Sequence, residues 1–479
     1  MTQATSTFRF PLLIDNERQE GAEWKSILSP FDGRAVSQVA FGSAADLDRA
    51  IAAAEKAFHT WKNSSRFDRA SLLRDMAVRI KARRQEFVDC IVEEGGKPRT
   101  FASAEVERCL STFTAAAEEA RRQHGEEIPL DLEARTKRYF GLTVRRPLGV
   151  IAAVTPFNFP VNLVAHKLAP ALATGNTMVI KPASQTPSGA HLLAEVAVEC
   201  GVPPGVVNVV PCNRQVGNAL ATDPRIRMLS FTGSSDVGWA LQRQAVRKRV
   251  VLELGGNAAV VVHSDANLET AVQRCVAGGF GQAGQSCISV QRILVQRDIY
   301  ESFLARLTEA AQACPSGDPR EDKVVVGPVI DRASAERLEA WVGEAKAAGA
   351  KVMCGGTRKG SVFEATVLAN TTRDMKVNSE EVFGPVVTVT PYERFEDALA
   401  QVNDSAFGLQ AGVFTQDIKR AWQALNELEV GGVLVNDVPT QRVDTQPYGG
   451  VKDSGLGREG LRYAMDEMTE IRILMLNLA

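Results

Sequence analysis

The stretch GQAGQSC, residues 281–287, places a cysteine thiol behind small and amide side chains, and two more glycines precede it at positions 278 and 279. A backbone with so few bulky side chains lets another molecule approach Cys287, and an ionised thiol is a strong nucleophile. In a reducing compartment most cysteines are instead inert residues that pack like small apolar side chains. The stretch alone therefore leaves two interpretations of Cys287 open, a nucleophile and a structural thiol.

Two further motifs contain residues suited to chemistry. Glu253 lies within the apolar stretch VVLELGG, where a carboxylate is costly unless it is paired or functional. In FTGSSDVG, Gly233 and Ser234 stand where a predicted strand passes into a predicted helix, so that free backbone N–H groups can attract a phosphate. The motif lacks the G-x-G-x-x-G pattern of dinucleotide sites, and a Gly-Ser turn is more often a plain loop.

The elements that must position these residues alternate between helix and strand. Apolar residues recur at helical spacing over residues 43–62, led by Ser43, and over residues 66–97, so two helices are expected to open the chain. Helical segments then alternate with short apolar runs, which predict strands at residues 149–156, 177–183, 206–211 and 228–234. This order predicts a parallel α/β sheet with right-handed crossovers and a ligand site at the carboxyl ends of its strands.

The alternation resumes after residue 253 and continues to about residue 437, which predicts a second α/β domain that shares a cleft with the first. Two strand-like segments stand apart from both domains, one at residues 124–149 and one at residues 467–479. We expect the two segments to pair with each other. Because edge strands readily pair with another chain, they would form a small sheet that bridges subunits.

The composition favours small-molecule chemistry. The 479 residues are 45% hydrophobic and 23% charged, enough for more than one buried core, and the net charge of −2 gives no basic field for nucleic acid or anionic lipid. The N-terminal 21 residues have no sustained apolar core behind a basic start, so neither a signal peptide nor a transit peptide is expected. The longest apolar stretch, residues 149–165, is broken by prolines and asparagines and is no membrane span. We therefore expect a cytoplasmic enzyme.

The eight cysteines include no C-x-x-C pair, and only five histidines accompany them. A zinc framework is therefore unsupported, and no metal site is expected. Most of the cysteines are expected to be reduced thiols in the core, such as Cys90 and Cys109, which lie among helical apolar positions.

Seven motifs together resemble the aldehyde dehydrogenase superfamily, in its order and approximate spacing. They lie between residues 155 and 460 and read TPFNFP, KPASQTP, FTGSSDVG, LELGGN, GQSC, EEVFGPV and PYGGVKDSGLGREG. One such match can arise by chance, whereas seven in order are specific, and the resemblance covers nearly the whole chain.

The resemblance implies an aldehyde dehydrogenase-like α/β fold, with two Rossmann-related parallel α/β domains and a small β oligomerisation element. We expect a dinucleotide-binding domain at residues 1–124 and 148–253 and a catalytic domain at residues 254–465. Residues 125–147 and 466–479 would form the oligomerisation element of a homodimer or homotetramer.

The resemblance also implies a mechanism. Cys287 would add to the aldehyde carbonyl, a hydride would pass from the adduct to the nicotinamide ring, and water would hydrolyse the resulting thioester. Asn158 in TPFNFP matches the residue whose amide, with the Cys287 backbone N–H, stabilises the oxyanion. Glu253 in LELGG matches the general base that activates water.

The cofactor implied by the resemblance is NAD or NADP, with NAD slightly favoured. Lys181 would bind the adenosine ribose, Ser234 the pyrophosphate and Glu381 the nicotinamide ribose, while Phe383 would pack beside the ring. The motifs add the further contacts Thr155, Pro156, Phe157, Ser184, Gly217, Phe231, Gly233, Val237 and Leu254. Ser184 stands where many NAD-dependent relatives have a glutamate that would repel the 2′-phosphate of NADP, which weakens selection against NADP.

The substrate tunnel implied by the resemblance is polar. His166 and Arg442 occupy positions that are bulky and apolar in relatives that handle hydrophobic aldehydes. Arg108 would face the same tunnel, with a surface salt bridge as the alternative, and guanidinium groups favour a carboxylate, phosphonate or phosphate. The other expected substrate contacts are Phe159, Ser286, Ile288 and Tyr448. We therefore expect a small polar, anionic aldehyde as the substrate.

Two other functions stay open. A CoA-acylating relative would pass the acyl group to the thiol of CoA, but such enzymes typically lack the base that Glu253 supplies. A non-catalytic binding protein on the same fold would not need Cys287, Glu253 and Asn158 together.

Overall fold

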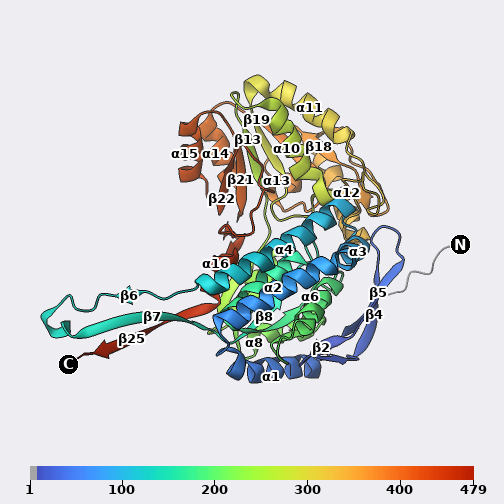
Figure 1. Cartoon of the computed structure of the whole chain (residues 1–479). Coiled ribbons are helices and arrows are strands. Elements are labelled where there is room, and N and C mark those ends of the chain that lie inside the picture. Colours follow the sequence, from blue (N-terminus) through green and yellow to red (C-terminus); the bar gives the residue numbers. More distant parts are fainter. Residues whose placement is uncertain (1–7, 479) are drawn as a thin grey trace.

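The computed structural model describes residues 8–478 as two lobes and a projecting arm (Figure 1). Each lobe has its own sheet with helices packed on it, and the arm leaves the first lobe on the side opposite the described N-terminal strands. Residues 1–7 and residue 479 lie outside the described residues. The expectation that the chain has no signal or transit peptide concerns residues that include 1–7. The predicted ranges of the dinucleotide-binding domain and of the oligomerisation element also include undescribed residues.

The first lobe is built on an eight-stranded sheet whose central strands are parallel. In spatial order its strands are β24 (Gly455–Leu456), β12 (Arg249–Glu253), β11 (Ile226–Thr232), β8 (Val150–Val154), β9 (Thr177–Lys181), β10 (Val207–Val209), β2 (Leu12–Ile14) and β3 (Glu17–Gln19). Antiparallel pairing adds β24 at one edge and β2 with β3 at the other. A smaller sheet beside it contains β1 (Phe8–Phe10), β5 (Ala35–Phe41) and β4 (Glu23–Leu28).

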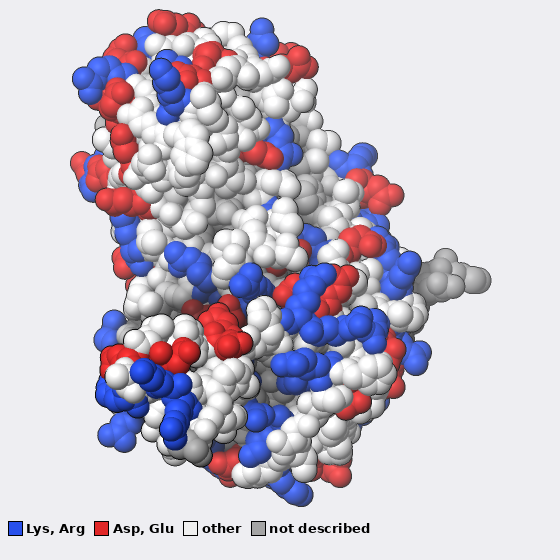
Figure 2. Space-filling view, turned by 60° about the vertical axis from the view of Figure 1, so that its left-hand side comes forward, with Lys and Arg blue, Asp and Glu red and all other residues white. Residues whose placement is uncertain are grey.

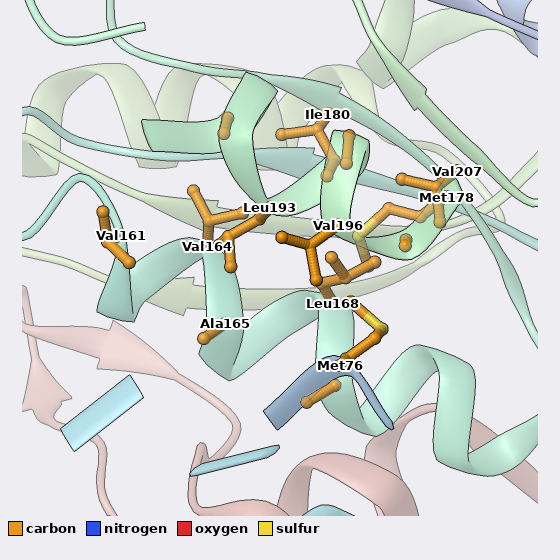
Figure 3. Close-up of a cluster of buried hydrophobic side chains, with 14 of the residues drawn as sticks. Met76, Val161, Val164, Ala165, Leu168, Met178, Ile180, Leu193, Val196 and Val207 are labelled. Carbon is orange, nitrogen blue, oxygen red and sulfur yellow. The ribbon is translucent and has the colours of Figure 1, made fainter. Parts of the chain in front are cut away.

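Helices cover this sheet and enclose the first core. They are α1 (Ala44–Trp61), α2 (Arg66–Ala82), α3 (Arg84–Gly95), α4 (Arg99–Arg122), α5 (Asn162–Thr174), α6 (Ser188–Glu199), α7 (Arg214–Gly217), α8 (Ala219–Thr222), α9 (Ser235–Gln244) and α16 (Leu461–Glu467). Figure 3 shows part of the core, in which Leu168 of α5 and Leu193 of α6 face Met178 and Ile180 of β9. α5 is buried along its whole length, so it is apolar on nearly every side.

The second lobe has a seven-stranded sheet that is parallel apart from one edge strand. Its strands are β15 (Lys351–Cys354), β18 (Thr366–Ala369), β19 (Val386–Tyr392), β14 (Arg292–Gln296), β13 (Ala259–Val262), β21 (Gln410–Phe414) and β22 (Gly432–Val435). Its helices are α10 (Leu268–Phe280), α11 (Tyr300–Gln312), α12 (Arg332–Ala347), α13 (Lys376–Ser379), α14 (Phe395–Asn403) and α15 (Ile418–Glu427). Two short ribbons complete it, β16 (Arg358–Lys359) with β17 (Val362–Phe363) and β20 (Phe407–Gly408) with β23 (Val451–Lys452).

The arm joins the two segments that the sequence set apart. Strand β25 (Thr469–Asn477) pairs antiparallel with β7 (Tyr139–Pro147) along its whole length, and β6 (Glu127–Ile128) adds a third strand. The predicted pairing of the two segments is confirmed. The arm extends away from both lobes, as Figure 1 shows.

Several predictions about elements need correction. Strands β1 to β5 precede the first helix, so the chain does not open with two helices. These strands are three to seven residues long, and such short runs carry little periodic signal. The expected helix over residues 66–97 is divided into α2 and α3 at Arg83.

The predicted parallel α/β architecture is confirmed, and Ser43 begins α1 with a capping box to Asp46. The domain boundaries remain a prediction. Strand β24 pairs with β12 of the first sheet, and α16 packs on α5. We therefore propose that the catalytic unit ends before residue 455 instead of at residue 465.

The surface carries both signs of charge. On the face in Figure 2, Lys and Arg side chains lie among Asp and Glu side chains over most of the two lobes. Between residues 8 and 478, no helix combines the length and apolar character that crossing a bilayer requires.

Candidate functional site

A cavity of about 360 Å³ is lined by residues of both lobes. Cys287 and Glu253 both face it, although 34 positions separate them in the sequence. Its wall includes six of the seven predicted substrate contacts, namely Arg108, Phe159, Ser286, Ile288, Arg442 and Tyr448. Phe101, Glu105, Gln282, Thr440, Gln441 and Glu459 also contribute to the wall.

The glycine-rich backbone before Cys287 is needed for close packing and for an unusual turn. A Cβ on Gly279 would lie 2.7 Å from the Val387 side chain, so only glycine lets α10 approach the second sheet this closely. Residues 282, 283 and 284 follow in the left-handed region with φ of 50°, 56° and 65°. A Cβ on Gly284 would lie 2.2 Å from the carbonyl oxygen of Gly384. The turn directs Cys287 into the cavity.

The Cys287 thiol is held by a tyrosine. Its Sγ lies 3.1 Å from the Tyr448 hydroxyl oxygen, and the Arg442 guanidinium lies 3.6 Å from the centre of the Tyr448 ring. Burial raises the pKa of the thiol to about 12, and the Tyr448 hydrogen bond and the Arg442 charge partly oppose this rise. The surroundings therefore keep the thiol protonated, and the hydrogen bond and the cation are the groups that favour its ionised form.

Glu253 is the least satisfied acid of the cavity. It is buried at the carboxyl end of β12, and neither of its carboxyl oxygens has a hydrogen-bond partner among residues 8–478. Burial, together with the nearby Glu459 charge, raises the pKa of Glu253 well above its usual range. Glu459 itself accepts a hydrogen bond from Lys167 at 2.7 Å, and its nearby cations hold its pKa at about 2 against the effect of burial.

Asn158 lies beside the nucleophile loop and outside the main cavity wall. Its Nδ2 donates to the backbone oxygen of Gln285 at 3.0 Å, two residues before Cys287. The loop that carries Asn158 is anchored by Glu105 of α4, which accepts hydrogen bonds from the backbone N–H groups of Val161 at 2.9 Å and Asn162 at 3.1 Å. The Glu105 carboxylate thus lies at the N-terminal end of α5, where a negative charge interacts favourably with the positive end of the helix dipole.

Arg108, His166 and Arg442 form one cluster, centred on Asp444. Arg108 donates two hydrogen bonds to Asp444, at 2.6 and 3.1 Å, and the ring of His166 contacts the same carboxylate at 2.9 Å. Arg442 Nη2 lies 3.4 Å from His166 Nδ1. His166 is buried, contacts Arg442 and is not part of the cavity wall in the described chain, so its expected contact with the substrate stays a prediction.

The expected cofactor residues gather at the carboxyl edge of the first sheet. Thr155, Pro156 and Phe157 follow β8, while Lys181 ends β9 and is followed by the exposed Ser184. Phe231 lies in β11, with Gly233, Ser234 and Val237 just beyond it; Leu254 follows β12, and Gly217 ends α7. Glu381 and Phe383 come from the second lobe, and the rings of Phe383 and Phe157 meet edge to face with centres 5.7 Å apart.

The residues present fit a dinucleotide. Helix α9 begins at Ser234, whose side chain makes no capping hydrogen bond, so the hydroxyl and the first N–H groups of the helix are free to bind a phosphate. A Cβ on Gly217 would lie 2.8 Å from the Lys181 side chain, so glycine at this position leaves room for the lysine side chain at the edge of the sheet. Glu381 is half-buried, accepts one hydrogen bond from the Gly256 N–H at 2.9 Å, and can accept others from sugar hydroxyls.

Comparison with known proteins gives the same result for the whole chain. The aldehyde dehydrogenase family model matches residues 17–474. The 3-sulfolactaldehyde dehydrogenase of Priestia aryabhattai is 42% identical over 100% of both chains, and the mitochondrial succinate-semialdehyde dehydrogenase of Arabidopsis thaliana is 39% identical over 94% of this chain and 85% of its own. The crystal structure of aldehyde dehydrogenase 21 from Physcomitrella patens, in complex with its product succinate, superposes with a TM-score of 0.97 at 38% identity, covering 99% of each chain.

Fold, site and comparisons together define a two-lobed, nucleotide-dependent oxidoreductase. The chain belongs to the aldehyde dehydrogenase family. It is therefore an enzyme of NAD(P)-dependent aldehyde oxidation, as the motif resemblance predicted. Solved relatives include both NAD and NADP complexes.

Sequence reasoning missed the residues that hold the functional groups in place. Asp444 joins Arg108 to His166, Glu105 anchors the Asn158 loop, and Lys97 pairs with Glu105 beneath the ring of Phe159. Glu105 precedes Arg108 by three positions on one helix, and Asp444 follows Arg442 by two, so spacing marked both acids as neighbours of predicted site residues.

Proposed function

We propose that this enzyme oxidises a small, negatively charged aldehyde to the carboxylic acid through a thioester on Cys287. The observation that carries the proposal is the cavity itself, because Cys287, Glu253 and Arg442 all open into it. A nucleophile, a base and an anion-binding group thus face one space whose volume suits a small substrate.

The first half-reaction needs the Cys287 sulfur to add to the aldehyde carbon. Tyr448 donates its hydroxyl proton in a hydrogen bond to the sulfur, which favours the ionised form. The negative oxygen that forms on the substrate accepts hydrogen bonds from the Cys287 backbone N–H and from the second N–H of the Asn158 amide, whose first N–H is held by Gln285. When bound, the nicotinamide ring supplies the acceptor for the hydride.

The second half-reaction needs a base for water. Glu253 suits this role because its carboxyl has no partner of its own in the described structure and its raised pKa makes it a stronger base. It removes a proton from a water that attacks the thioester carbon, and the Cys287 sulfur leaves. Glu459 remains tied to Lys167 and keeps its charge.

The anionic part of the substrate would lie against Arg442, whose side chain lines the cavity and is only 6% exposed. Guanidinium groups bind carboxylates and other oxyanions through paired hydrogen bonds. The substrates named for two relatives, 3-sulfolactaldehyde and succinate semialdehyde, both contain an acidic group, which supports this assignment.

Either dinucleotide fits the residues that we assign to the cofactor. Lys181, Ser234 and Glu381 would bind the adenosine ribose, the pyrophosphate and the nicotinamide ribose. The exposed Ser184 presents no carboxylate to a 2′-phosphate, so we propose that NADP is accepted as well as NAD.

The substrate proposal is tested by the production of NADH or NADPH, with and without CoA, from succinate semialdehyde, lactaldehyde, phosphonoacetaldehyde, sulfoacetaldehyde and hexanal. We expect hexanal to have the lowest kcat/KM, because its apolar chain leaves Arg442 buried without an anion. CoA should not increase turnover. If hexanal has the highest kcat/KM, the proposal of an anionic substrate is wrong. A strict need for CoA would indicate a CoA-acylating enzyme.

A further inference from the structure

Three acidic side chains at the anion-binding end of the cavity each pair with a basic side chain of their own. Glu105 pairs with Lys97, and Glu459 pairs with Lys167 at 2.7 Å. Asp444 pairs with Arg108 through two hydrogen bonds, at 2.6 and 3.1 Å. These pairs cancel three positive and three negative charges.

Arg442 is the cation that these three pairs do not neutralise. Its nearest carboxylate oxygens, on Glu459 at 3.5 Å and on Asp444 at 3.9 Å, belong to acids that other cations hold more closely. Its Nε atom has no hydrogen-bond partner within the described residues. The guanidinium group stays charged at every pH that the enzyme meets. It is thus a buried cation on the cavity wall with a free donor.

The remaining titratable groups do not change this balance. Burial and the Glu459 charge raise the pKa of Glu253, and burial and the Arg442 charge lower the pKa of His166, so the surroundings favour the neutral form of both groups. Arg458 donates to the backbone oxygens of Gly450 and Gly457 and lies outside the cavity wall. One net positive charge therefore faces the substrate.

We propose that Asp444, by neutralising Arg108, sets the site for an aldehyde whose remote group carries one negative charge, such as a carboxylate or a sulfonate. A doubly charged phosphonate or phosphate would bring a second charge into the cavity without a partner, which is costly. Asp444 is thus a selectivity residue that acts through Arg108. This inference rests on the proposed function and adds the charge of the substrate to it.

Two isosteric aldehydes test the proposal on the unmodified enzyme. Sulfoacetaldehyde and phosphonoacetaldehyde have the same length and a tetrahedral head group, but at about pH 8.5 the second carries one more charge. We expect kcat/KM to favour sulfoacetaldehyde by about tenfold at that pH. Near pH 6, where much of the phosphonate holds a proton, the ratio should move toward one. A ratio that stays near one at both pH values would overturn the proposal.

A double-mutant cycle of Asp444 and Arg108 tests the role of Asp444. Asp444→Asn keeps the size of the side chain and frees Arg108, so the preference should shift toward phosphonoacetaldehyde by about tenfold. Arg108→Gln removes the second cation and should weaken both substrates, phosphonoacetaldehyde more. The double variant restores one net charge and should restore the preference of the unmodified enzyme. A purely structural role of Asp444 would lower both kcat/KM values alike and leave their ratio unchanged.

The matched control is Asp223→Asn, which breaks a similar two-point pair with Arg225 far from the cavity wall. Its substrate ratio should equal that of the unmodified enzyme. If Asp444→Asn does not fold, the Arg108→Gln variant and the pH series still decide the outcome. If neither charged aldehyde is oxidised and hexanal is, the proposed function fails; if both charged aldehydes are oxidised equally, only the charge inference fails.

Discussion

The Cys287 side chain must satisfy two opposing requirements. Burial raises the pKa of its thiol to about 12, which favours the protonated, less nucleophilic form. Addition to an aldehyde requires the thiolate, and the Tyr448 hydroxyl at 3.1 Å and the Arg442 charge are the two groups that favour it. The reactivity of Cys287 thus depends on the cavity and not on the sequence stretch that carries it.

We expect Cys287→Ala to lower turnover by more than about a thousandfold, as the loss of a covalent nucleophile does elsewhere. The variant should bind NAD(P) normally and form no thioester. Cys275→Ala and Cys354→Ala are the controls, because both thiols are buried in the core of the second lobe and should leave turnover nearly intact. Substantial steady-state activity of Cys287→Ala would remove the proposed mechanism.

Glu253→Gln should separate the two half-reactions. Glutamine keeps the size of the side chain but cannot take a proton from water, so deacylation should stall while hydride transfer proceeds. Mixing the variant with aldehyde and NAD(P) should give a burst of NAD(P)H near one per site and then a slow phase. Mass spectrometry should find the acyl group on Cys287.

The pH profile provides a second measure of Glu253. Because its pKa is raised, steady-state turnover of the unmodified enzyme should rise as pH increases above the usual range of a carboxyl. Loss of the burst together with steady-state turnover would assign Glu253 to activation of the thiol. Undiminished turnover in Glu253→Gln would show that another group, such as Glu459, supplies the base.

At the scale of elements, the buried side chain of Glu94 connects two helices and a strand. Glu94 of α3 accepts hydrogen bonds from the hydroxyl groups of Ser37 in β5 and Ser188 in α6, and from the Ser188 backbone N–H at 3.1 Å. Burial raises its pKa from 4.5 to about 7 against the effect of these hydrogen bonds. The contact between these elements therefore involves a carboxyl group that is neutral in mildly acidic solution.

This group makes stability depend on pH in an unusual direction. The folded pKa lies above the unfolded one, so the contribution of Glu94 is complete below pH 4.5 and is lost as pH rises toward about 7. The loss amounts to up to about 3 kcal/mol of the free energy of unfolding. In Glu94→Gln this loss should disappear from denaturant unfolding curves measured across that range. Glu86→Gln, an exposed acid on the same helix, should behave as the unmodified protein, and identical pH profiles for all three would contradict the prediction.

At the scale of the whole molecule, the arm has no cover on either face. Strand β25 presents Ile471, Ile473 and Met475 on one side and Leu474 and Leu476 on the other, and Leu478 follows the strand. All six side chains are 40% to 67% exposed. A small sheet with apolar residues exposed on both faces needs a covering partner, because exposed apolar patches favour association with another surface. We therefore propose that another copy of the chain covers it in a homodimer or homotetramer.

Deletion of residues 470–479 should dissociate the oligomer, as measured by analytical ultracentrifugation. Ile473→Glu is the gentler variant, because it keeps the backbone pairing with β7 and places a charge on one apolar face. Ile418→Glu, at an equally apolar exposed position on α15, is the comparison for a charge placed elsewhere. A truncated protein that sediments like the full-length chain would refute the assignment of the arm.

Much of the architecture follows from local patterns in the sequence. The short apolar runs that became β8, β9, β10 and β11 and the seven ordered motifs predict the α/β fold and the family without any coordinates. They do so because strand and helix periodicity is decided within a few residues, and because the motifs lie at the strand ends where ligands bind. The strands at the start of the chain escaped prediction because most of them are only three residues long, and one of them, β2, also pairs with a distant strand through Leu13 and Val209.

The functional assignments depend differently on sequence and structure. The types of Cys287, Glu253 and Asn158 and their motifs determined which residues to propose for the chemistry. Only the tertiary structure decided that His166 contacts Arg442 and that Asp444 neutralises Arg108. The His166–Arg442 contact joins residues 276 positions apart, and the Arg108–Asp444 pair joins residues 336 positions apart. No local pattern encodes contacts over such separations. The net charge of a buried site depends on which charged side chains the fold brings into contact. An unpaired charge is costly there, and a charge with an opposite partner is neutralised.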